Sequence, residues 1–318
     1  MDSNKPKVVH DLSPMMVVYE DGTIQRFLGN DLVPPSLDDP SLQVKSKDVV
    51  FSPENNLSSR IYLPKTISSD QKLPLLVYYH GGAFCIESPF SATYHAYLNK
   101  LVEEANIIAV SVDYRLVPEH PIPAAYEDSW AALKWVASHF NGEGSEEWLN
   151  NHADLNKVFL AGDSAGGNIA HYIAMRNSEE KLTGVDISGI VLVHPYFWGE
   201  VAVGDEVNNL EGRKKIESFW RYTHPNVGLD DPLINPECDP NLGRLGCSGS
   251  VLVIVAEKDI LKDRGWWYYE RLKKSGFKGN VEIMEAKEET HVFHLFKPTC
   301  ENAIIMLKKI ASFLNQMS

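Results

Sequence analysis

Apolar and β-branched runs recur along the chain, and turn residues bound each of them. Most of these runs are apolar at nearly every position, which is typical of strands that are covered on both faces. They lie at Arg60–Leu63, Leu73–Tyr79, Ile107–Tyr114, Val158–Ala161, Ile187–Val193, Val251–Ala256 and Val281–Ala286. The pattern predicts a sheet buried between two layers.

Helical patterns separate these predicted strands. Tyr94–Ala105 and Ala124–Phe140 place their large apolar residues on one stripe, which is typical of a helix packed on a core. Similar patterns cover Ile169–Arg176, Tyr268–Lys274 and Ala303–Leu314. Strands that alternate with helices form βαβ crossovers, so we predict an α/β fold with a mainly parallel sheet and helices on both faces.

Two stretches interrupt this alternation. Residues 1–45 have little period, and residues 196–248 are rich in Trp, Pro, Asn and Gly, with one helical pattern at Arg213–Tyr222. Neither stretch resembles a domain with its own core. We expect residues 1–318 to form a single domain in which both stretches contribute to a cap over the sheet. The alternative is two ordinary surface excursions.

Composition narrows the possible functions. The 318 residues carry 30 basic and 43 acidic side chains, a formal net charge of −13, which disfavours binding to nucleic acid or anionic membranes. No apolar run reaches the roughly 18 residues of a spanning helix, and the first residues lack the apolar core of a secretory signal. The four Cys are scattered without a CxxC pair. We expect a globular protein of a reducing compartment.

The sequence Gly-Asp-Ser-Ala-Gly at residues 162–166 follows a predicted strand and precedes a helical pattern. A serine nucleophile needs this context, because a tight strand-to-helix turn projects its hydroxyl from the sheet. Gly162 and Gly166 lack the Cβ atoms that would block such a turn. We therefore predict that Ser164 is a nucleophile and that the Ala165 N–H, at a helix N-terminus, is an oxyanion donor.

A second glycine-rich turn, His80-Gly81-Gly82, ends the strand predicted at Leu73–Tyr79. Backbone N–H groups in such a turn are free to point at a ligand oxygen, so we predict Gly81 and Gly82 as oxyanion-hole donors. His80 is interpreted as a structural residue that shapes the turn. A plain glycine-rich turn is the alternative, but the position one βα unit before Ser164 argues against it.

A serine hydroxyl needs a base, and the base needs an orienting acid. The loops after two later strands offer Asp259 and His291, and the chain order Ser164, Asp259, His291 recurs in serine hydrolases. Asp259 is preferred because the acid lies a few residues past its strand. His291 is preferred because its rival stands among apolar residues that pack. The rivals of these two residues are Glu257, Asp263 and His294.

Four aromatic residues follow these motifs or lie in the predicted cap, and we expect them to line a substrate pocket. They are Phe84, Trp198, Phe219 and Phe293. The alternative for each of them is the hydrophobic core. The sequence has no HExxH motif, no GxGxxG turn after a strand and no Walker A motif, so we expect neither a metal nor a cofactor.

The chain resembles the plant carboxylesterases of the hormone-sensitive-lipase type. The resemblance is carried by HGGAF, DYRLVPEHPIPAAYED, GDSAGGNIAHY, EKD and HVFHLFKP, in the family's order, from about residue 8 onward. It implies an α/β-hydrolase sheet of eight strands with an N-terminal cap, no cofactor, and a location in the cytoplasm, with the nucleus as a further site. The family's triad and oxyanion donors fall on Ser164, Asp259, His291, Gly81, Gly82 and Ala165.

Two positions depart from the family pattern, since Ala83 replaces a frequent third Gly and Thr290 replaces a common acidic residue. Because the whole triad is present, we expect hydrolysis of a small ester, of an aromatic or specialised-metabolite type. The alternative is a dehydratase or cyclase that resembles 2-hydroxyisoflavanone dehydratase, and a hormone-receptor-like binding protein is a weaker one. We expect a small-molecule substrate, no nucleic-acid or membrane partner, and a monomer or homodimer.

Overall fold

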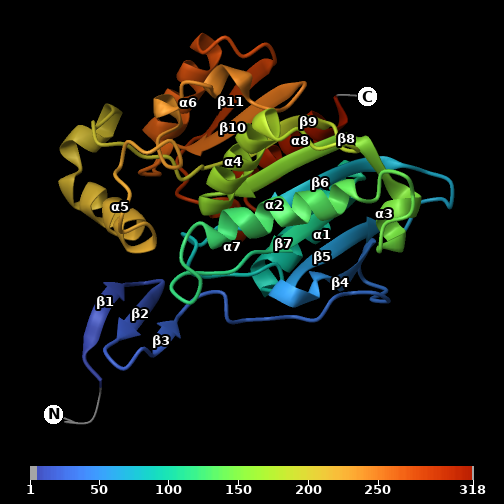
Figure 1. The fold of residues 1–318 in the computed structure, drawn as a ribbon, viewed down its shortest axis with the longest axis horizontal. Helices are drawn as coiled ribbons and strands as arrows, with labels where there is room; N and C mark the ends of the chain where they lie inside the picture. The colour runs from blue at the N-terminus through green and yellow to red at the C-terminus, as the bar shows by residue number, and fades with distance from the viewer. Residues whose placement is uncertain (1–5, 317–318) are drawn as a thin grey trace.

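The centre of the computed structural model, which describes residues 6–316, is a sheet of eight strands (Figure 1). The strand order is β11-β10-β9-β8-β6-β7-β5-β4. The strands span β4 Val44–Ser52, β5 Leu57–Pro64, β6 Leu73–Tyr79, β7 Ile108–Asp113, β8 Ala153–Asp163, β9 Ile187–Val193, β10 Ser250–Ala256 and β11 Asn280–Ala286. β6 to β11 run parallel, whereas β4 and β5 join antiparallel at one edge. The predicted α/β class is confirmed.

Seven of these strands coincide with the predicted runs, and β4 is the one that the pattern does not reveal. β4 forms the edge of the sheet, and its residues alternate between buried and more exposed positions. Lys45, Lys47 and Asp48 take part in that alternation, so the strand carries no continuous apolar run. An edge strand that is covered on one face only is expected to have this mixed composition.

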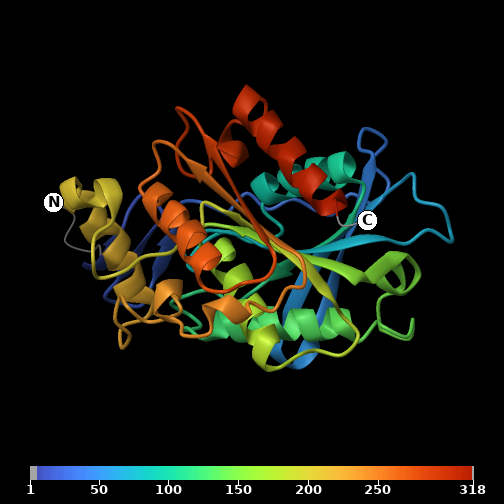
Figure 2. The ribbon, with the colours of Figure 1, turned by 90° about the horizontal axis from the view of Figure 1, so that it is seen from above.

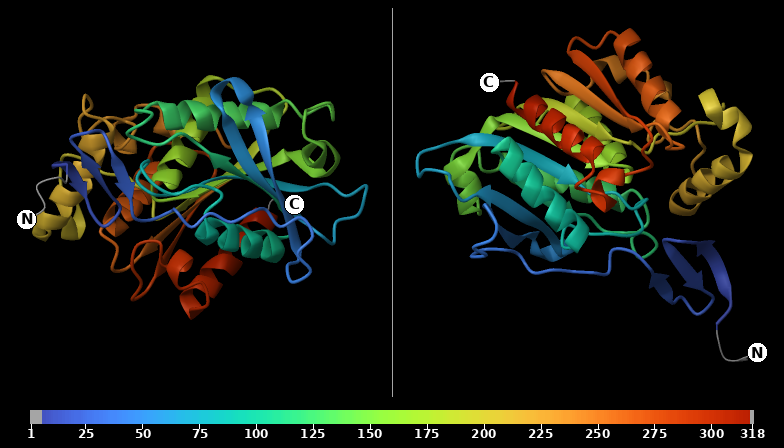
Figure 3. Two further views of the ribbon diagram at one scale, coloured as in Figure 1. Left: turned by 90° about the horizontal axis from the view of Figure 1, so that it is seen from below. Right: turned by 180° about the vertical axis from the view of Figure 1, so that it is seen from behind.

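Helices cover both faces of the sheet (Figures 2 and 3). They span α1 Ala92–Ala105, α2 Ala124–Ala137, α3 Glu147–His152, α4 Ala165–Glu179, α5 Leu210–Thr223, α6 Lys262–Lys274, α7 Phe293–Phe296 and α8 Glu301–Asn315. Leu101 of α1 and Ile310 of α8 belong to one apolar core with the strands. Leu133 of α2, Ile169 of α4 and Leu272 of α6 belong to a second core on the other face.

Both stretches that interrupt the alternation place part of their chain at the same end of the molecule (Figure 1). In the first, β1 (Val8–Leu12), β2 (Met16–Tyr19) and β3 (Ile24–Arg26) form a separate antiparallel sheet. The second contains α5. Residues 1–5 and 317–318, which belong to the predicted single domain, lie outside the described residues. None of the helices within residues 6–316 has the length and apolar character that crossing a membrane requires.

Candidate active site

Ser164 stands on the turn between β8 and α4, where β8 ends at Asp163 and α4 begins at Ala165. Its backbone has φ 52° and ψ −118°, which is an unusual conformation for a residue other than glycine. The turn is also very tight. A Cβ atom on Gly162 would overlap the backbone of Gly166, and one on Gly166 would overlap the carbonyl oxygen of Tyr79. The two glycines are therefore needed for the close approach that exposes the serine.

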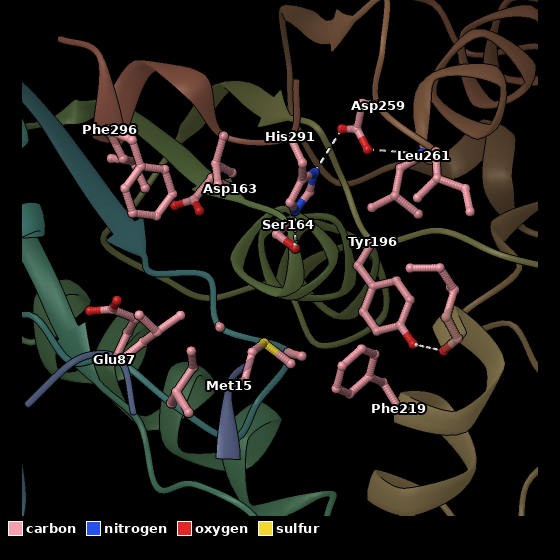
Figure 4. Close-up of a pocket in the computed structure, with 18 of the residues that line it drawn as sticks. Met15, Glu87, Asp163, Ser164, Tyr196, Phe219, Asp259, Leu261, His291 and Phe296 are labelled. Carbon is pink, nitrogen blue, oxygen red and sulfur yellow. Dashed lines mark hydrogen bonds and ion pairs between the residues drawn. The ribbon is translucent and has the colours of Figure 1, made fainter. Parts of the chain in front are cut away.

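The structure brings the side chains of Ser164, His291 and Asp259 together, although they come from three separate loops (Figure 4). The Nδ1 atom of His291 lies 2.7 Å from Oδ2 of Asp259, and its Nε2 atom lies 3.0 Å from Oγ of Ser164. A carboxylate only accepts hydrogen bonds, so the proton belongs on Nδ1 of the neutral imidazole. Nε2 is then free to accept the proton of the Ser164 hydroxyl.

The electrostatics of this pair suit a histidine base. Burial alone would lower the pKa of His291, but the adjacent Asp259 carboxylate outweighs it and raises the pKa above the ordinary value. Burial alone would raise the pKa of Asp259. The charge and hydrogen bond of His291 lower it by more, so the pKa of the carboxyl is lower than its ordinary value. Asp259 also accepts a hydrogen bond of 3.0 Å from the Leu261 N–H. The acid is therefore held ionised behind the imidazole.

The rival residues are placed elsewhere. Glu257 accepts a hydrogen bond from the Glu288 N–H, and Asp263 accepts one from the Asp205 N–H. His294 is buried, and its ring packs edge-on against Tyr97 at 5.0 Å between centroids. None of the three rivals shares a hydrogen bond with Ser164 or His291 among the bonds of residues 6–316.

A further histidine, His194, stands directly behind this site. Its Nδ1 atom accepts a hydrogen bond of 2.9 Å from the N–H of Val292, the residue that follows His291. Its ring centroid lies 5.7 Å from that of His291, and polar atoms of His194, Asp259 and His291 all lie within 4.8 Å of one another. Burial lowers the pKa of His194 to about 3, so a neutral acceptor holds the loop of the candidate base.

The oxyanion turn requires one correction. The N–H of Gly81, a predicted donor, is bonded at 2.7 Å to the hydroxyl of Tyr94. That hydroxyl in turn donates to Oδ2 of Asp163 at 2.9 Å. Gly81 therefore anchors the turn and does not border the cavity, whereas Gly82 and Ala83 do. Among residues 6–316, no hydrogen bond occupies the N–H of Gly82 or of Ala83.

His80 lies behind the same turn, as its structural interpretation requires. It is completely buried, and its ring stacks on that of Tyr114 with 4.2 Å between centroids. Burial lowers its pKa to about 4, so the imidazole stays neutral near pH 7. The Tyr114 hydroxyl donates to the His80 carbonyl oxygen at 2.6 Å. These contacts fix the start of the glycine-rich turn.

Ser164 and His291 open into a cavity of about 380 Å³. Most of its walls are apolar, and both stretches that interrupt the alternation contribute to them. Met15 and Leu28 belong to the N-terminal stretch, and Ile216 and Phe219 belong to α5. A pocket of this size and lining is typical of a small-molecule site.

Of the four aromatic residues predicted to line the pocket, the structure places only Phe219 there. Phe84 is fully buried against Tyr126, and Phe293 is buried beside His194. Their motif positions turn their rings into the core. Trp198 is also fully buried. The cavity-lining role is corrected to a core role for Phe84, Trp198 and Phe293.

Sequence reasoning missed several residues that border the cavity. Met15 and Leu28 lie in a stretch without period, so nothing in the pattern marks them. Tyr196 follows β9, and its hydroxyl donates to the carbonyl oxygen of Ile216 in α5 at 2.8 Å. Glu87 lies seven residues after His80 in the loop that follows the oxyanion turn. Its position beyond a glycine-rich turn is the one signal that could have drawn attention to it.

Comparisons with known proteins agree with this architecture. A family model described as alpha/beta hydrolase fold matches residues 76–295. The chain belongs to the α/β-hydrolase fold family. A "Probable carboxylesterase 2" of Arabidopsis thaliana is 49% identical over 100% of this chain and 99% of its own length. The resemblance to plant carboxylesterases is thereby confirmed.

Two further comparisons bear on what this family member does. A protein of Glycyrrhiza echinata named 2-hydroxyisoflavanone dehydratase is 46% identical over 97% of this chain and 96% of its own length. The solved structure of a hyperthermophilic esterase from the archaeon Pyrobaculum calidifontis has a TM-score of 0.71 and 29% identity, and covers 86% of each chain. Carboxylesterase names and esterase structures together support a hydrolase enzyme.

Proposed function

We propose that this hydrolase is a serine carboxylesterase that acts on small esters. The observation that carries the proposal is the continuous chain of contacts from Asp259 through His291 to Ser164, at 2.7 and 3.0 Å. Ser164 stands on a tight turn that exposes its hydroxyl, and it borders an apolar cavity large enough for a small ester. Relatives named carboxylesterase provide independent support.

In the proposed reaction, Oγ of Ser164 attacks the acyl carbon of the ester while Nε2 of His291 takes the hydroxyl proton. Asp259 stabilises the resulting imidazolium. The carbonyl oxygen becomes an oxyanion, and we assign its donors to the N–H groups of Gly82, Ala83 and Ala165. His291 then returns the proton to the departing alcohol, and a water molecule hydrolyses the acyl-enzyme by the same two steps.

We further propose that the N-terminal stretch and the segment around α5 act as a cap. Leu28 from the first and Phe219 from the second both border the cavity, so neither wall exists without its segment. A cap of this kind excludes bulk water from the acyl-enzyme except for the water that reacts. These two segments, together with the loops at the end of the sheet, then set the size of substrate that enters.

The decisive experiment removes the nucleophile. Ser164→Ala is expected to lower kcat on para-nitrophenyl acetate by roughly 10⁵- to 10⁶-fold, by analogy with other serine hydrolases. It should also abolish covalent labelling by a fluorophosphonate probe. Ser312→Ala, an exposed serine of α8, is the matched control and should keep both properties. Near wild-type turnover by Ser164→Ala would refute the proposal.

A lyase is the second candidate, because relatives 44% and 46% identical to this chain are named 2-hydroxyisoflavanone dehydratase. A histidine base beside an oxyanion hole also suits removal of a proton next to a carbonyl. The two candidates differ in the role of Ser164, since elimination forms no acyl-enzyme. Dehydration of a 2-hydroxyisoflavanone by Ser164→Ala, with ester hydrolysis lost, would favour the lyase.

A further inference from the structure

The oxyanion turn, residues 80–84, and the nucleophile turn, residues 163–165, follow neighbouring strands. β6 and β8 pair in parallel up to Tyr79 and Gly162, so both turns lie beyond the last pair of this ladder. An oxyanion donor stabilises the transition state only at about 3 Å from the developing negative charge. A contact other than strand pairing must therefore set how the two turns lie relative to each other.

The backbone of the oxyanion turn also needs to be held. Gly82, Ala83 and Phe84 have φ angles of 102°, 51° and 64°, and a positive φ is unfavourable for a residue with a side chain. The N–H groups of Cys85 and Ile86 donate to the Gly82 carbonyl oxygen at 2.9 and 3.1 Å. These two bonds lie within one loop, so they do not fix its distance from the nucleophile.

A chain of hydrogen bonds through side chains links the two turns. The Gly81 N–H donates to the Tyr94 hydroxyl at 2.7 Å, and this hydroxyl donates to Oδ2 of Asp163 at 2.9 Å. Burial raises the pKa of Tyr94 well above its ordinary value, so the hydroxyl keeps the proton that it donates. Asp163 directly precedes Ser164. The chain therefore ends at the nucleophile, and among residues 6–316 no hydrogen bond joins the two turns directly.

The oxyanion turn also packs closely on the Asp163 carboxylate. A Cβ atom on Gly81 would overlap Oδ2 of Asp163 and would lie 3.0 Å from the Tyr94 hydroxyl, so this approach requires a glycine. The other carboxylate oxygen, Oδ1, accepts a hydrogen bond of 2.7 Å from the Tyr78 hydroxyl. Because both oxygens are bonded, the carboxylate is held in one orientation beneath the turn.

Asp163 is an unfavourable residue to bury at this place. It is 1% exposed, and its hydrogen-bond donors are two tyrosine hydroxyls and not a cation. Burial raises its pKa to about 6, because those hydroxyls and the charge of His291 offset the effect only in part. In the view of Figure 4, Asp163 and Asp259 lie on opposite sides of Ser164. A buried acid with a perturbed pKa beside a nucleophile is typical of a functional site.

From these contacts we propose that Asp163 is a positioning residue, which holds the oxyanion turn through the Tyr94 hydroxyl so that the N–H groups of Gly82 and Ala83 stay directed at the oxyanion. The proposal rests on the proposed esterase function, in which those groups stabilise the tetrahedral intermediate. Displacement of a catalytic group by about 1 Å lowers the rate of the chemical step by up to about 100-fold. Loss of the link should therefore lower kcat and change KM little.

Two single variants break the link at different points. Tyr94→Phe removes the hydroxyl, and Asp163→Asn removes the charged acceptor. Each should lower kcat on para-nitrophenyl acetate by roughly 10- to 100-fold and keep KM within about 3-fold of the wild type. The measurement is made on the plateau of the pH profile, and kcat is calculated per active site titrated with a fluorophosphonate, so a loss of folded protein cannot imitate the effect.

Tyr97→Phe is the matched control, because it removes a hydroxyl from the next turn of the same helix. The Tyr97 hydroxyl is buried and has no hydrogen-bond partner within residues 6–316, so this variant should keep the wild-type kcat. A kcat of Tyr94→Phe that falls no further than that of Tyr97→Phe would overturn the proposal.

The double variant Asp163→Asn/Tyr94→Phe tests whether the two residues act as one chain. Because either change alone breaks the same link, the double variant should lose about as much kcat as the weaker of the two single variants. A loss equal to the product of the two single losses would mean that the residues contribute independently, which would contradict the proposal.

Hydrogen–deuterium exchange separates this proposal from the proposed function, because it needs no substrate. Peptides that cover residues 80–86 should exchange roughly 3- to 10-fold faster in Tyr94→Phe and Asp163→Asn than in the wild type and Tyr97→Phe, since the turn is held less firmly. Faster exchange in a protein that cleaves no ester would support the holding of the turn and reject the esterase. Unchanged exchange in both variants would overturn the proposal, whatever the result with esters.

Discussion

Ser164, His194 and Val292 have φ angles of 52°, 45° and 46°, and all three lie at the candidate triad. A backbone conformation with positive φ costs a residue with a side chain roughly 1–3 kcal/mol, so neighbouring contacts must hold it. The Ser164 N–H donates to the Val193 carbonyl oxygen at 2.9 Å, and the His194 N–H donates to that of Ile254 at 2.7 Å. The strained residues are therefore tied to the ends of β9 and β10.

His194 is expected to act as a positioning residue. His194→Ala removes the acceptor of the Val292 N–H and frees the loop that carries His291. We expect kcat to fall by roughly 10- to 100-fold with little change in KM, because misplacement of a catalytic group affects the chemical step. His194→Asn, which keeps an acceptor oxygen, should recover part of the loss. If both variants lose the same activity and the same thermal stability, His194 has only a packing role.

The pH profile tests the role of Asp259. The base must be neutral to accept the serine proton, so activity should rise with pH through the pKa of His291, which the Asp259 carboxylate raises. Asp259→Asn removes the charge that stabilises the imidazolium. We expect kcat to fall by about 10⁴-fold and the acidic limb of kcat/KM to move to lower pH. Glu257→Gln, the rival acid, should keep the wild-type midpoint, and a shift in that variant instead would contradict the assignment.

Chemistry explains which single residues could be predicted. A nucleophilic serine needs glycines, a turn and a later histidine in a fixed order, so Ser164 and His291 have a signal along the chain. The role of His194 depends on one hydrogen bond in space, from the Val292 N–H, so this residue has no such signal. Trp198 is aromatic and lies in the predicted cap, but its ring is fully buried and packs against the guanidinium groups of Arg213 and Arg264.

At the scale of elements, a buried ion cluster ties the segment around α5 to the α/β core. Glu206 precedes α5, and both its oxygens accept hydrogen bonds from Arg264 of α6, at 2.6 and 2.7 Å. Arg213 of α5 bonds the same carboxylate at 2.8 Å. The guanidinium groups of Arg213 and Arg264 lie 5.4 and 5.1 Å from the Trp198 ring. The segment that supplies Phe219 to the cavity is anchored here.

Breaking this cluster should destabilise the protein more than breaking an exposed ion pair. Arg264→Leu leaves the buried Glu206 carboxylate with one cation and is expected to lower the free energy of unfolding by about 3–5 kcal/mol. Lys274→Ala, which breaks the exposed pair with Glu270, should cost less than about 1 kcal/mol. Urea unfolding monitored by tryptophan fluorescence measures both. Similar decreases in the free energy of unfolding in the two variants would show that the buried cluster stabilises the protein no more than an exposed ion pair.

Strands could be predicted from the sequence where helices cover both faces of the sheet. β6 and β9 have the bounds that the apolar runs predict, because every side chain on a central strand meets a helix layer. β1, β2 and β3 were missed because they are three to five residues long and form a small sheet of their own. A run of three to five residues is too short for its hydrophobic pattern to predict a strand. These segments form strands because of their contacts with neighbouring parts of the fold.

On the scale of the whole molecule, buried titratable groups decide how stability responds to pH. Burial is the main cause that lowers the pKa of several histidines far below 6.5. They are His80, His95, His171, His194, His224 and His294. Burial raises the pKa of Asp113 and Asp163 to about 6 and also raises that of Glu87, and the Asp259 carboxylate raises the pKa of His291. The two groups of residues act on stability in opposite directions.

As the pH falls from 7 to 5, the unfolded chain protonates these histidines while the folded chain keeps them neutral, so folding loses stability. Asp113 and Asp163 take up protons in the folded state first and gain stability over the same range. The six histidines with a lowered pKa outnumber the four groups with a raised one. We therefore expect the free energy of unfolding to be lower at pH 5 than at pH 7.5, by an amount on the order of a few kcal/mol.

Urea unfolding at a series of pH values tests this balance, and two variants test its parts. His171→Gln removes one histidine, whose ring is bonded to the Tyr268 hydroxyl at 3.1 Å, and should flatten the pH dependence by about one proton. Asp113→Asn removes an opposing acid and should steepen it. Because the two variants move the slope in opposite directions, a general loss of stability cannot imitate the result. Equal stability at pH 5 and pH 7.5 in the wild type would contradict the expectation.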